Sequence, residues 1–259
     1  MNIIPEIKEL NIENLSDVLQ LQDKIIAGFK TEEKHFILKR SVQDFIKALD
    51  SLDTHMIGIF DQGKLIAQSI FEFPQNNHHR DMEEFASNIP NNDLVIFKAT
   101  LVDKDYRGQG LMQQILSYRE QKALQAGKKI AISQIAIDNP SSWINALKSG
   151  MTIRKVDNDP YDNAKVLYMQ KELGKKHNNI QTSAKTFEMF IGNNIQQTIP
   201  LLFNKMKYLA QNGYRGIAFN KENKSIIWQQ SSCQHMLVHH NTKHIMLSNA
   251  LGKTTQNLL

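Results

Sequence analysis

A turn with two glycines at residues 106–111, Tyr-Arg-Gly-Gln-Gly-Leu, constrains the fold of this chain more than any other segment. The preceding residues 94–102 are mostly apolar and favour a β-strand. Apolar residues then recur at helical spacing as far as Gly127, which predicts a helix over 110–126. Where a strand, a glycine turn and a helix N-terminus meet, backbone N–H groups and the positive end of the helix dipole can bind an anion such as a diphosphate.

The same turn has a simpler interpretation, an ordinary connection between a strand and a helix. It matches neither Gly-x-x-x-x-Gly-Lys-Ser/Thr nor Gly-x-Gly-x-x-Gly, so the sequence does not indicate a nucleotide-phosphate loop or a dinucleotide loop. The short motif alone does not decide between an anion site and a plain turn.

The segment 107–112 resembles the Gln/Arg-x-x-Gly-x-Gly/Ala signature of the GCN5-related N-acetyltransferase (GNAT) family, with Met112 where that family usually has glycine or alanine. Further on, Asp138-Asn139-Pro140-Ser141-Ser142 is similar to the family's Asn-Pro-x-Ser helix start, and Gly150-Met151 to its closing glycine and large apolar residue. The resemblance covers residues 1–173. It implies an α/β fold with a GNAT-like mixed, mostly antiparallel sheet and helices on both faces.

Apolar periodicity and turn residues predict the remaining elements of this first part. The prediction is a strand over 4–10, a helix over 12–29, a helix capped by Ser41, a hairpin of 56–60 with 65–73, a short helix at 81–87, a strand over 129–137, a helix over 141–149, and strands over 151–156 and 165–172.

Charge divides the chain near Gly174. Residues 175–259 carry ten Lys and Arg but only two acids, whereas residues 1–174 carry 21 basic and 24 acidic residues. We therefore predict two domains, a GNAT-like acetyltransferase domain over 1–173 and a small basic α+β domain over 174–259. The second is expected to hold a helix from Thr198 to Gly213 and two strand pairs, 216–220 with 225–230 and 235–239 with 244–247.

Composition narrows the class of protein. The single cysteine, Cys233, excludes a disulfide framework and a Cys-rich zinc site. His78-His79 with Glu83-Glu84 is a sparse cluster without a third histidine nearby, so we expect no metal. Apolar runs are too short for a transmembrane segment and no signal peptide is visible, which together favour a cytoplasmic location.

The resemblance implies acetyl coenzyme A (acetyl-CoA) as the acyl donor, with its diphosphate on main-chain amides of the glycine turn. Leu101 and Val102, at the end of the preceding strand, would hydrogen-bond the pantetheine arm as an added strand would. Asn139 would orient that arm, and the alternative interpretation of this residue is a helix cap or turn residue. The cofactor-binding residues implied in this way are Leu101, Val102, Arg107, Gly108, Gln109, Gly110, Leu111, Met112, Gln113 and Asn139.

The resemblance also implies direct attack of a neutral amine on the thioester. At pH 7, deprotonation costs roughly 4.6 kcal/mol for a lysine of pKa ~10.4 and about 1 kcal/mol for an α-amine near ~7.8, so a base matters more for lysine. Cys233 lies outside the matched region, which argues against a covalent enzyme intermediate.

The chain departs from the family in its acid and base. Many members carry a tyrosine where this chain has Ala146, and a glutamate on the strand 94–102, whose only ionisable residue here is Lys98. Glu72, near the end of the neighbouring predicted strand, is the candidate base, although residues of this kind are more often solvated strand ends. Weaker candidates are Asp103 and Asp93 as bases, and Tyr168 and Tyr118 as proton donors.

These residues favour an N-acyltransferase that acetylates an amine-bearing small molecule or protein. The alternative, favoured by Ala146 and Lys98, is a catalytically weak or inactive CoA-binding module for regulation or interaction. A third interpretation, nucleic-acid binding by residues 175–259, lacks a basic cluster with interleaved aromatics. Residues 175–259 are expected to bind an acidic partner, to form a homodimer, or to pack on the first domain.

Overall fold

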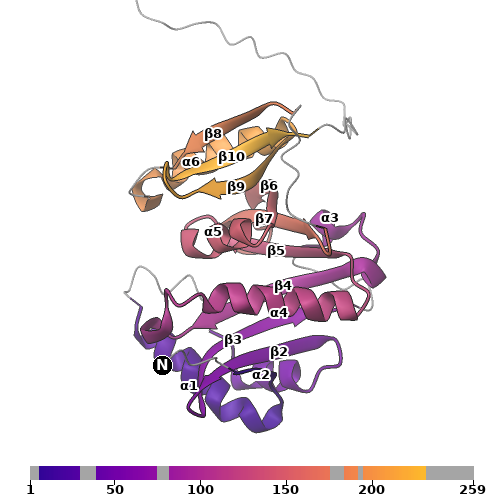
Figure 1. The fold of residues 1–259 in the computed structure, drawn as a ribbon, viewed down its shortest axis with the longest axis vertical. Helices are drawn as coiled ribbons and strands as arrows, with labels where there is room; N and C mark the ends of the chain where they lie inside the picture. Colours follow the sequence, from indigo (N-terminus) through magenta and orange to yellow (C-terminus); the bar gives the residue numbers. More distant parts are fainter. Residues whose placement is uncertain (1–5, 30–38, 75–81, 176–183, 192–194, 232–259) are drawn as a thin grey trace, which may run out of the picture.

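The computed structural model describes residues 6–29, 39–74, 82–175, 184–191 and 195–231. Ten strands form one sheet in the order β1-β2-β3-β4-β5-β7-β6-β9-β10-β8 (Figure 1). Every neighbouring pair is antiparallel except β4 with β5. The strands are β1 (Glu6–Glu9), β2 (Thr54–Asp61), β3 (Lys64–Glu72), β4 (Leu94–Val102), β5 (Ile130–Ala136), β6 (Thr152–Asn158), β7 (Lys165–Glu172), β8 (Thr186–Phe190), β9 (Tyr214–Asn220) and β10 (Ser225–Gln230).

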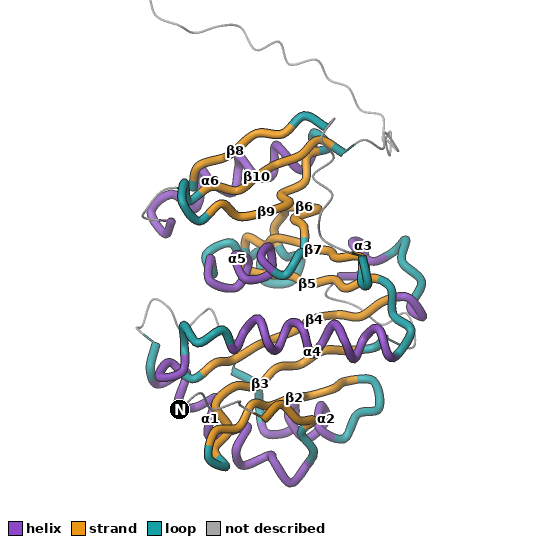
Figure 2. The backbone as a smooth tube through the Cα atoms, in the orientation of Figure 1, coloured by secondary structure: helices purple, strands orange, loops and turns teal. Residues whose placement is uncertain are grey.

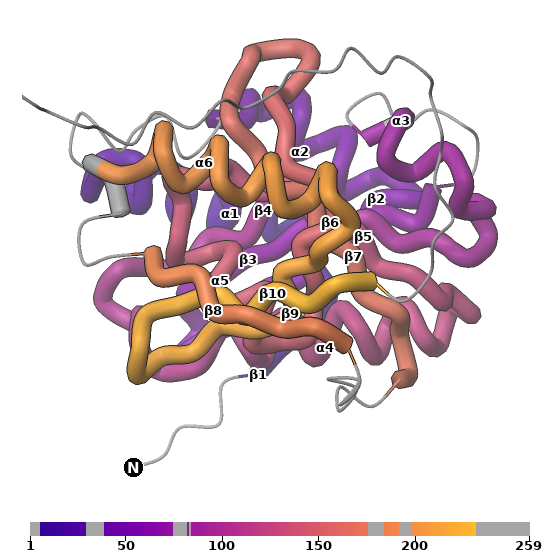
Figure 3. Tube along the Cα trace, turned by 90° about the horizontal axis from the view of Figure 1, so that it is seen from above, coloured from indigo at the N-terminus to yellow at the C-terminus, as the bar shows by residue number. Residues whose placement is uncertain are grey.

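The helices cover both faces of the sheet, which confirms the predicted mixed, mostly antiparallel α/β architecture. Viewed from above, α1, α2, α3 and α6 lie on one side and α4 and α5 on the other (Figure 3). The α-helices are α1 (Leu15–Ala27), α2 (Val42–Leu49), α3 (Glu83–Ala86), α4 (Leu111–Gln125), α5 (Pro140–Lys148) and α6 (Ile195–Gln211), with short 3-10 turns at η1 (Ile12–Asn14), η4 (Asn91–Asp93) and η5 (Lys104–Tyr106).

Alternation along the strands explains the two layers, because successive side chains of a strand point to opposite faces. Met56 of β2 and Ile70 of β3 are buried in a cluster with α1 and α2. Their neighbours Ile57 and Phe71 are buried in a second cluster with α4 and α5. Ser41 caps α2 as predicted, its Oγ accepting from Asp44 N at 3.2 Å.

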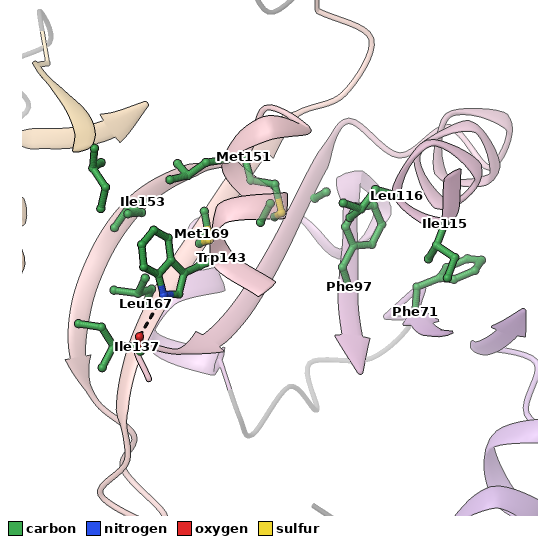
Figure 4. Close-up of a cluster of buried hydrophobic side chains, with 14 of the residues drawn as sticks. Phe71, Phe97, Ile115, Leu116, Ile137, Trp143, Met151, Ile153, Leu167 and Met169 are labelled. Atoms are coloured by element: carbon green, nitrogen blue, oxygen red, sulfur yellow. Dashed lines mark hydrogen bonds between the residues drawn. The ribbon is translucent and has the colours of Figure 1, made fainter. Parts of the chain in front are cut away.

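Strands β9, β10 and β8 extend the same sheet. β9 joins β6 through the pair Ile153 and Gly216, and a Cβ at Gly216 would lie 2.9 Å from Ile153 Cδ1, so glycine permits this contact. Trp143 of α5 meets Phe219 of β9 with ring centroids 6.4 Å apart, and its indole donates to Ile137 O at 3.0 Å (Figure 4). The boundary between two domains at residue 174 stays a prediction.

The strand pair β9–β10 and helix α6 agree closely with the predicted elements at 216–230 and 198–213. The sequence analysis did not predict strand β8, of whose five residues only Met189 is buried. The predicted strand pair 235–239 with 244–247 lies outside the described residues, as does Cys233.

The central strands part from each other. β4 and β5 pair in parallel over three residues only, Leu94–Ile96 with Ile130–Ile132, and both strands continue well beyond. Ser133 Oγ donates to Phe97 O at 2.9 Å where they diverge. Helix α4 runs alongside β4 (Figure 2), so its N-terminus lies beside the diverging ends.

Candidate functional site

A cavity of about 880 Å³ occupies the space between the diverging strands. We call it the slot, and its walls are residues 98–102 of β4, residues 133–136 of β5, the N-terminal turns of α4 and α5, and residues 25, 29 and 40 near α1 and α2. A volume of this size is typical of small-molecule and cofactor sites. The slot therefore is the candidate functional site.

The glycine turn, residues 107–113, borders the slot. Gly108 and Gly110 have φ angles of +79° and +78°, the left-handed region that favours glycine, and Gly110 is the N-cap of α4. Gln113 N and Gln114 N both return to Gly110 O, at 3.0 and 3.2 Å. Among the described residues, no backbone carbonyl accepts a hydrogen bond from the N–H groups of residues 111 and 112. These N–H groups lie at the positive end of the helix dipole.

The structure brings nine of the ten predicted cofactor-binding residues to the slot. Gln109 is the exception and is not part of its lining. Those in the lining are Leu101, Val102, Arg107, Gly108, Gly110, Leu111, Met112, Gln113 and Asn139. Their convergence on one cavity is a structural result, and their binding of a cofactor stays a prediction.

Three of these residues also hold the walls together. Arg107 Nε donates to Val102 O at 3.3 Å. Asn139 caps α5, its Oδ1 accepting from Ser142 N at 3.2 Å, so the helix-cap role is present beside any role towards a ligand. Gln113 Nε2 donates to Asn145 O and Oδ1, both at 3.1 Å, and thereby ties α4 to α5 across the slot.

The candidate base Glu72 does not line the slot. Its carboxylate forms an ion pair with Lys98, which does line the slot. Glu72 is therefore connected to the slot by its ion pair with Lys98, whose ammonium group neutralises the charge of its carboxylate.

The two weaker candidate bases have other partners. Asp103 is buried at the end of β4, where Lys24 Nζ lies 2.5 Å from its carboxylate. Burial acts to raise the pKa of Asp103, but the hydrogen bond and charge of Lys24 outweigh it and hold that pKa below its ordinary value. Asp93, at the start of β4, pairs with Lys129 at 2.8 Å. Neither carboxylate lines the slot.

Among the described residues, Tyr106 is the one tyrosine in the slot lining, and its hydroxyl donates to Asp61 Oδ2 at 2.9 Å. Tyr168, on β7 opposite Gln134, lies outside the lining, and burial together with neighbouring acids raises its pKa to about 12. Tyr118 of α4 is likewise absent from the lining. Ala146 is buried and does line the slot, so the position where many GNAT members carry tyrosine faces the site with a methyl group.

The sparse cluster of His78, His79, Glu83 and Glu84 is described only in part. His78 and His79 lie outside the described residues, and Glu84 pairs with Lys155 at 2.9 Å. In the described part of the chain no three metal-ligating side chains gather. Within the same part, none of the helices is long and apolar enough to span a membrane.

One residue of the slot lining was not singled out as a site residue by the sequence analysis. Arg119 of α4 is almost fully buried and lines the slot, where its Nη1 donates to Ile70 O and Lys98 O, both at 3.4 Å. The pairing of β3 with β4 shifts register here between Ser69 and Phe71, a β-bulge that leaves carbonyl groups in need of donors. Burial lowers the pKa of Arg119 to about 9, so it remains a cation at neutral pH.

Comparison with solved structures identifies the fold. Escherichia coli ribosomal-protein-S18-alanine N-acetyltransferase matches with a TM-score of 0.51 at 14% identity, over 68% of this chain and 99% of its own. The GNAT domain of S. lividans PAT matches with a TM-score of 0.51 at 13% identity, over 65% and 90%. Salmonella typhimurium yncA, solved with its cofactor acetyl-CoA, matches with a TM-score of 0.50 at 14% identity, over 67% and 96%.

These likenesses confirm, at the level of the fold, the resemblance to GNAT acetyltransferases predicted from the two motifs. No family model matches the chain, and no curated protein matches it in sequence.

Proposed function

We propose that this protein is an N-acyltransferase that transfers an acetyl group from acetyl-CoA to an amine acceptor. The observation that carries the proposal is the slot itself, because β4 and β5 part after three paired residues and a left-handed glycine turn heads α4 beside the gap. A thioester of coenzyme A has a diphosphate at one end of a long arm and the reactive carbonyl at the other. The glycine turn suits the first and the diverging strands suit the second.

The residues present fit such a ligand. The N–H groups of residues 111 and 112 meet no backbone acceptor among the described residues, so they are available to an anion. Arg107 and Lys148 line the slot, and their positive charge favours a polyanion. When bound, acetyl-CoA supplies the acetyl group in activated form, while Leu101 and Val102 orient the arm.

The chain's own groups then handle the amine. We propose that Glu72, acting beside Lys98, receives the proton that the amine loses, because this ion pair lies next to the slot. The slot walls exclude water from the thioester, which suppresses its hydrolysis. No side chain is required to form a covalent intermediate.

A second candidate function is a CoA-binding module without turnover. The observation that favours it is the pair of replacements in the slot wall, Ala146 where a tyrosine is usual and Lys98 where an acid is usual. Both candidate functions need the glycine turn, and only the first needs an amine.

Two measurements separate them. Calorimetric titration with coenzyme A tests binding, and release of free thiol from acetyl-CoA with a panel of amines tests transfer. Binding together with amine-dependent thiol release supports the acyltransferase. Binding without release supports the second candidate, and the absence of binding would refute both.

A further inference from the structure

We propose that the acceptor is a small amine that also carries a carboxylate, as a free amino acid does, and that Arg40 and Lys98 bind this carboxylate. The inference rests on the proposed function and names the substrate class of the same site.

The slot has a wall on each face of the sheet. The glycine turn borders it from the side of α4, where the diphosphate would lie. Ile25, Phe29 and Arg40 border it from the side of α1 and α2, the opposite face. Two ligands that react with each other must meet from different directions. An acceptor therefore enters along the α1 side.

Arg40 is held in place on that side. Gln22 of α1 is 1% exposed and uses both of its polar atoms on the backbone of Arg40, accepting from its N at 2.9 Å and donating to its O at 3.0 Å. The next residue, Ser41, begins α2 with a capping box. In the described part of the chain, no carboxylate forms an ion pair with Arg40.

Lys98 lies beside the point of divergence, one residue after Phe97, whose carbonyl accepts from Ser133. Its ammonium group pairs with Glu72, which lies outside the slot lining. The pair therefore presents a cation to the slot and keeps its carboxylate behind it. Arg119 fixes the main chain at the same position by donating to Lys98 O.

The charge of the lining decides which amine fits. Among the described residues of the slot lining, five are cationic and one, Asp138, is acidic. Arg40 and Lys98 border the α1 side together with Arg107, whose guanidinium lies 5.7 Å from the centroid of the Phe29 ring. A polyamine or a lysine-rich peptide would meet like charges there, whereas a carboxylate-bearing amine would meet opposite ones.

The reaction is balanced for such an acceptor. The amine nitrogen forms the new C–N bond as the C–S bond of the thioester breaks. At neutral pH the acceptor enters as an ammonium ion and loses two protons in all. The first passes to Glu72 and from there to solvent before the attack, and the second, lost as the C–N bond forms, ends on the departing thiolate. The acceptor's carboxylate takes no part beyond binding.

The test compares each amino acid with its amide in the thiol-release assay at saturating acetyl-CoA. The amide's amine is the less basic of the two, so it reacts faster unless the carboxylate is recognised. We expect at least one amino acid to show a kcat/KM tenfold or more above that of its amide. Arg40→Gln and Lys98→Gln should each reduce that ratio towards one by raising the KM for the amino acid.

The matched control is Lys39→Gln, because Lys39 neighbours Arg40, pairs with Asp23 at 2.8 Å and does not line the slot. It should leave the ratio unchanged. The KM for acetyl-CoA should stay within twofold in all three variants. If it rises in Arg40→Gln while the ratio holds, Arg40 binds the donor and the inference fails.

Binding provides a readout independent of turnover. Amino acids and amides are titrated into the protein saturated with coenzyme A. Tighter binding of the amino acid, lost in Arg40→Gln, supports the inference. Equal or tighter binding of the amide, or a preference for polyamines, would overturn it while leaving the acyltransferase proposal intact. The absence of coenzyme A binding itself would instead refute the proposed function.

Discussion

Arg119 Nη1 donates to Ser69 Oγ at 3.0 Å, which joins the middle of α4 to the interior of β3 at the level of the slot. Ser69 Oγ lies 2.8 Å from Thr100 Oγ1 on β4, so the contact extends across the β-bulge to the next strand. The guanidinium also lies over the Phe97 ring, 4.4 Å from its centroid. A buried cation thus fixes the two strands where the slot opens.

Replacing this cation tests its role as a positioning residue. We expect Arg119→Met to lower coenzyme A affinity, because the two strands that border the slot lose a shared donor. Two main-chain carbonyls and the Ser69 hydroxyl lose this donor, and each buried group left unpaired destabilises the folded protein by about 1–3 kcal/mol. Relief of the buried charge offsets part of this loss in overall stability. Ser69→Ala should act in the same direction but less strongly.

Calorimetry on the two single variants and the double variant gives the coupling between the residues. Contacting residues should give non-additive losses. Additive losses, or unchanged affinity in Arg119→Met, would show that the bulge is positioned by other contacts.

Gly110→Asp should abolish most coenzyme A binding while the protein still folds. It adds a side chain and a negative charge at the helix N-terminus, where the diphosphate is proposed to lie. Gly63→Asp is the matched control, because Gly63 has a φ of +79°, has open space at its Cβ as Gly110 does, and does not line the slot. Equal affinity in the two variants would refute the placement.

Glu72→Gln should lower turnover most at pH 6–7 and least near pH 9. The amine is mostly protonated at the lower pH and depends on a base, whereas at the higher pH more of it is already neutral. Asp93→Asn is the control, since Asp93 pairs with Lys129 at the other end of β4. A loss independent of pH, or no loss, would remove Glu72 from the mechanism.

The ion pair between buried Asp103 and partly exposed Lys24 should make stability depend on pH. The folded-state pKa of Asp103 is lowered, so its contribution is complete above the unfolded value of about 3.9 and disappears as the pH falls through the lower folded value. Urea unfolding should show Asp103→Asn to be less stable than the parent at pH 7. The difference should shrink below about pH 3.9 as the parent loses this contribution. A difference that persists unchanged in acid would assign it to packing.

Ending the chain after Gly174 should lower the thermal midpoint but preserve coenzyme A binding. The shorter chain uncovers Trp143 and Ile153, which pack against β9, while every residue in the slot lining precedes Gly174. A chain ending after Ser231 should keep the parent's midpoint if β8–β10 supply the missing cover. Loss of binding by the well-folded shorter chain would place residues 186–230 in the binding unit.

Local patterns made much of this structure predictable. The φ angles of Gly108 and Gly110 follow from the glycine turn between an apolar strand and an amphipathic helix. The Asn139-Pro140 pair is similarly local, since both the cap and the first helical residue adjoin each other.

Long-range contacts account for what the sequence did not show. Arg119 reads as one position of an apolar helical stripe, and its role depends on Ser69, Ile70 and Lys98, which come from two other strands. The single pair between Ile153 and Gly216 likewise joins strands with α6 between them in sequence. Neither contact leaves a periodic signal in the sequence.

The short pairing of β4 with β5 links ligand binding to stability. Residues Leu94–Ile96 and Ile130–Ile132 form the only ladder between strands β1–β4 and the rest of the described sheet. The pantetheine arm of coenzyme A, lying along Leu101, would supply β4 with the hydrogen-bond partners that it loses where β5 diverges from it. By thermodynamic linkage, the protein then resists unfolding in proportion to the logarithm of the ligand concentration above its dissociation constant. The sheet is most complete when its substrate forms part of it.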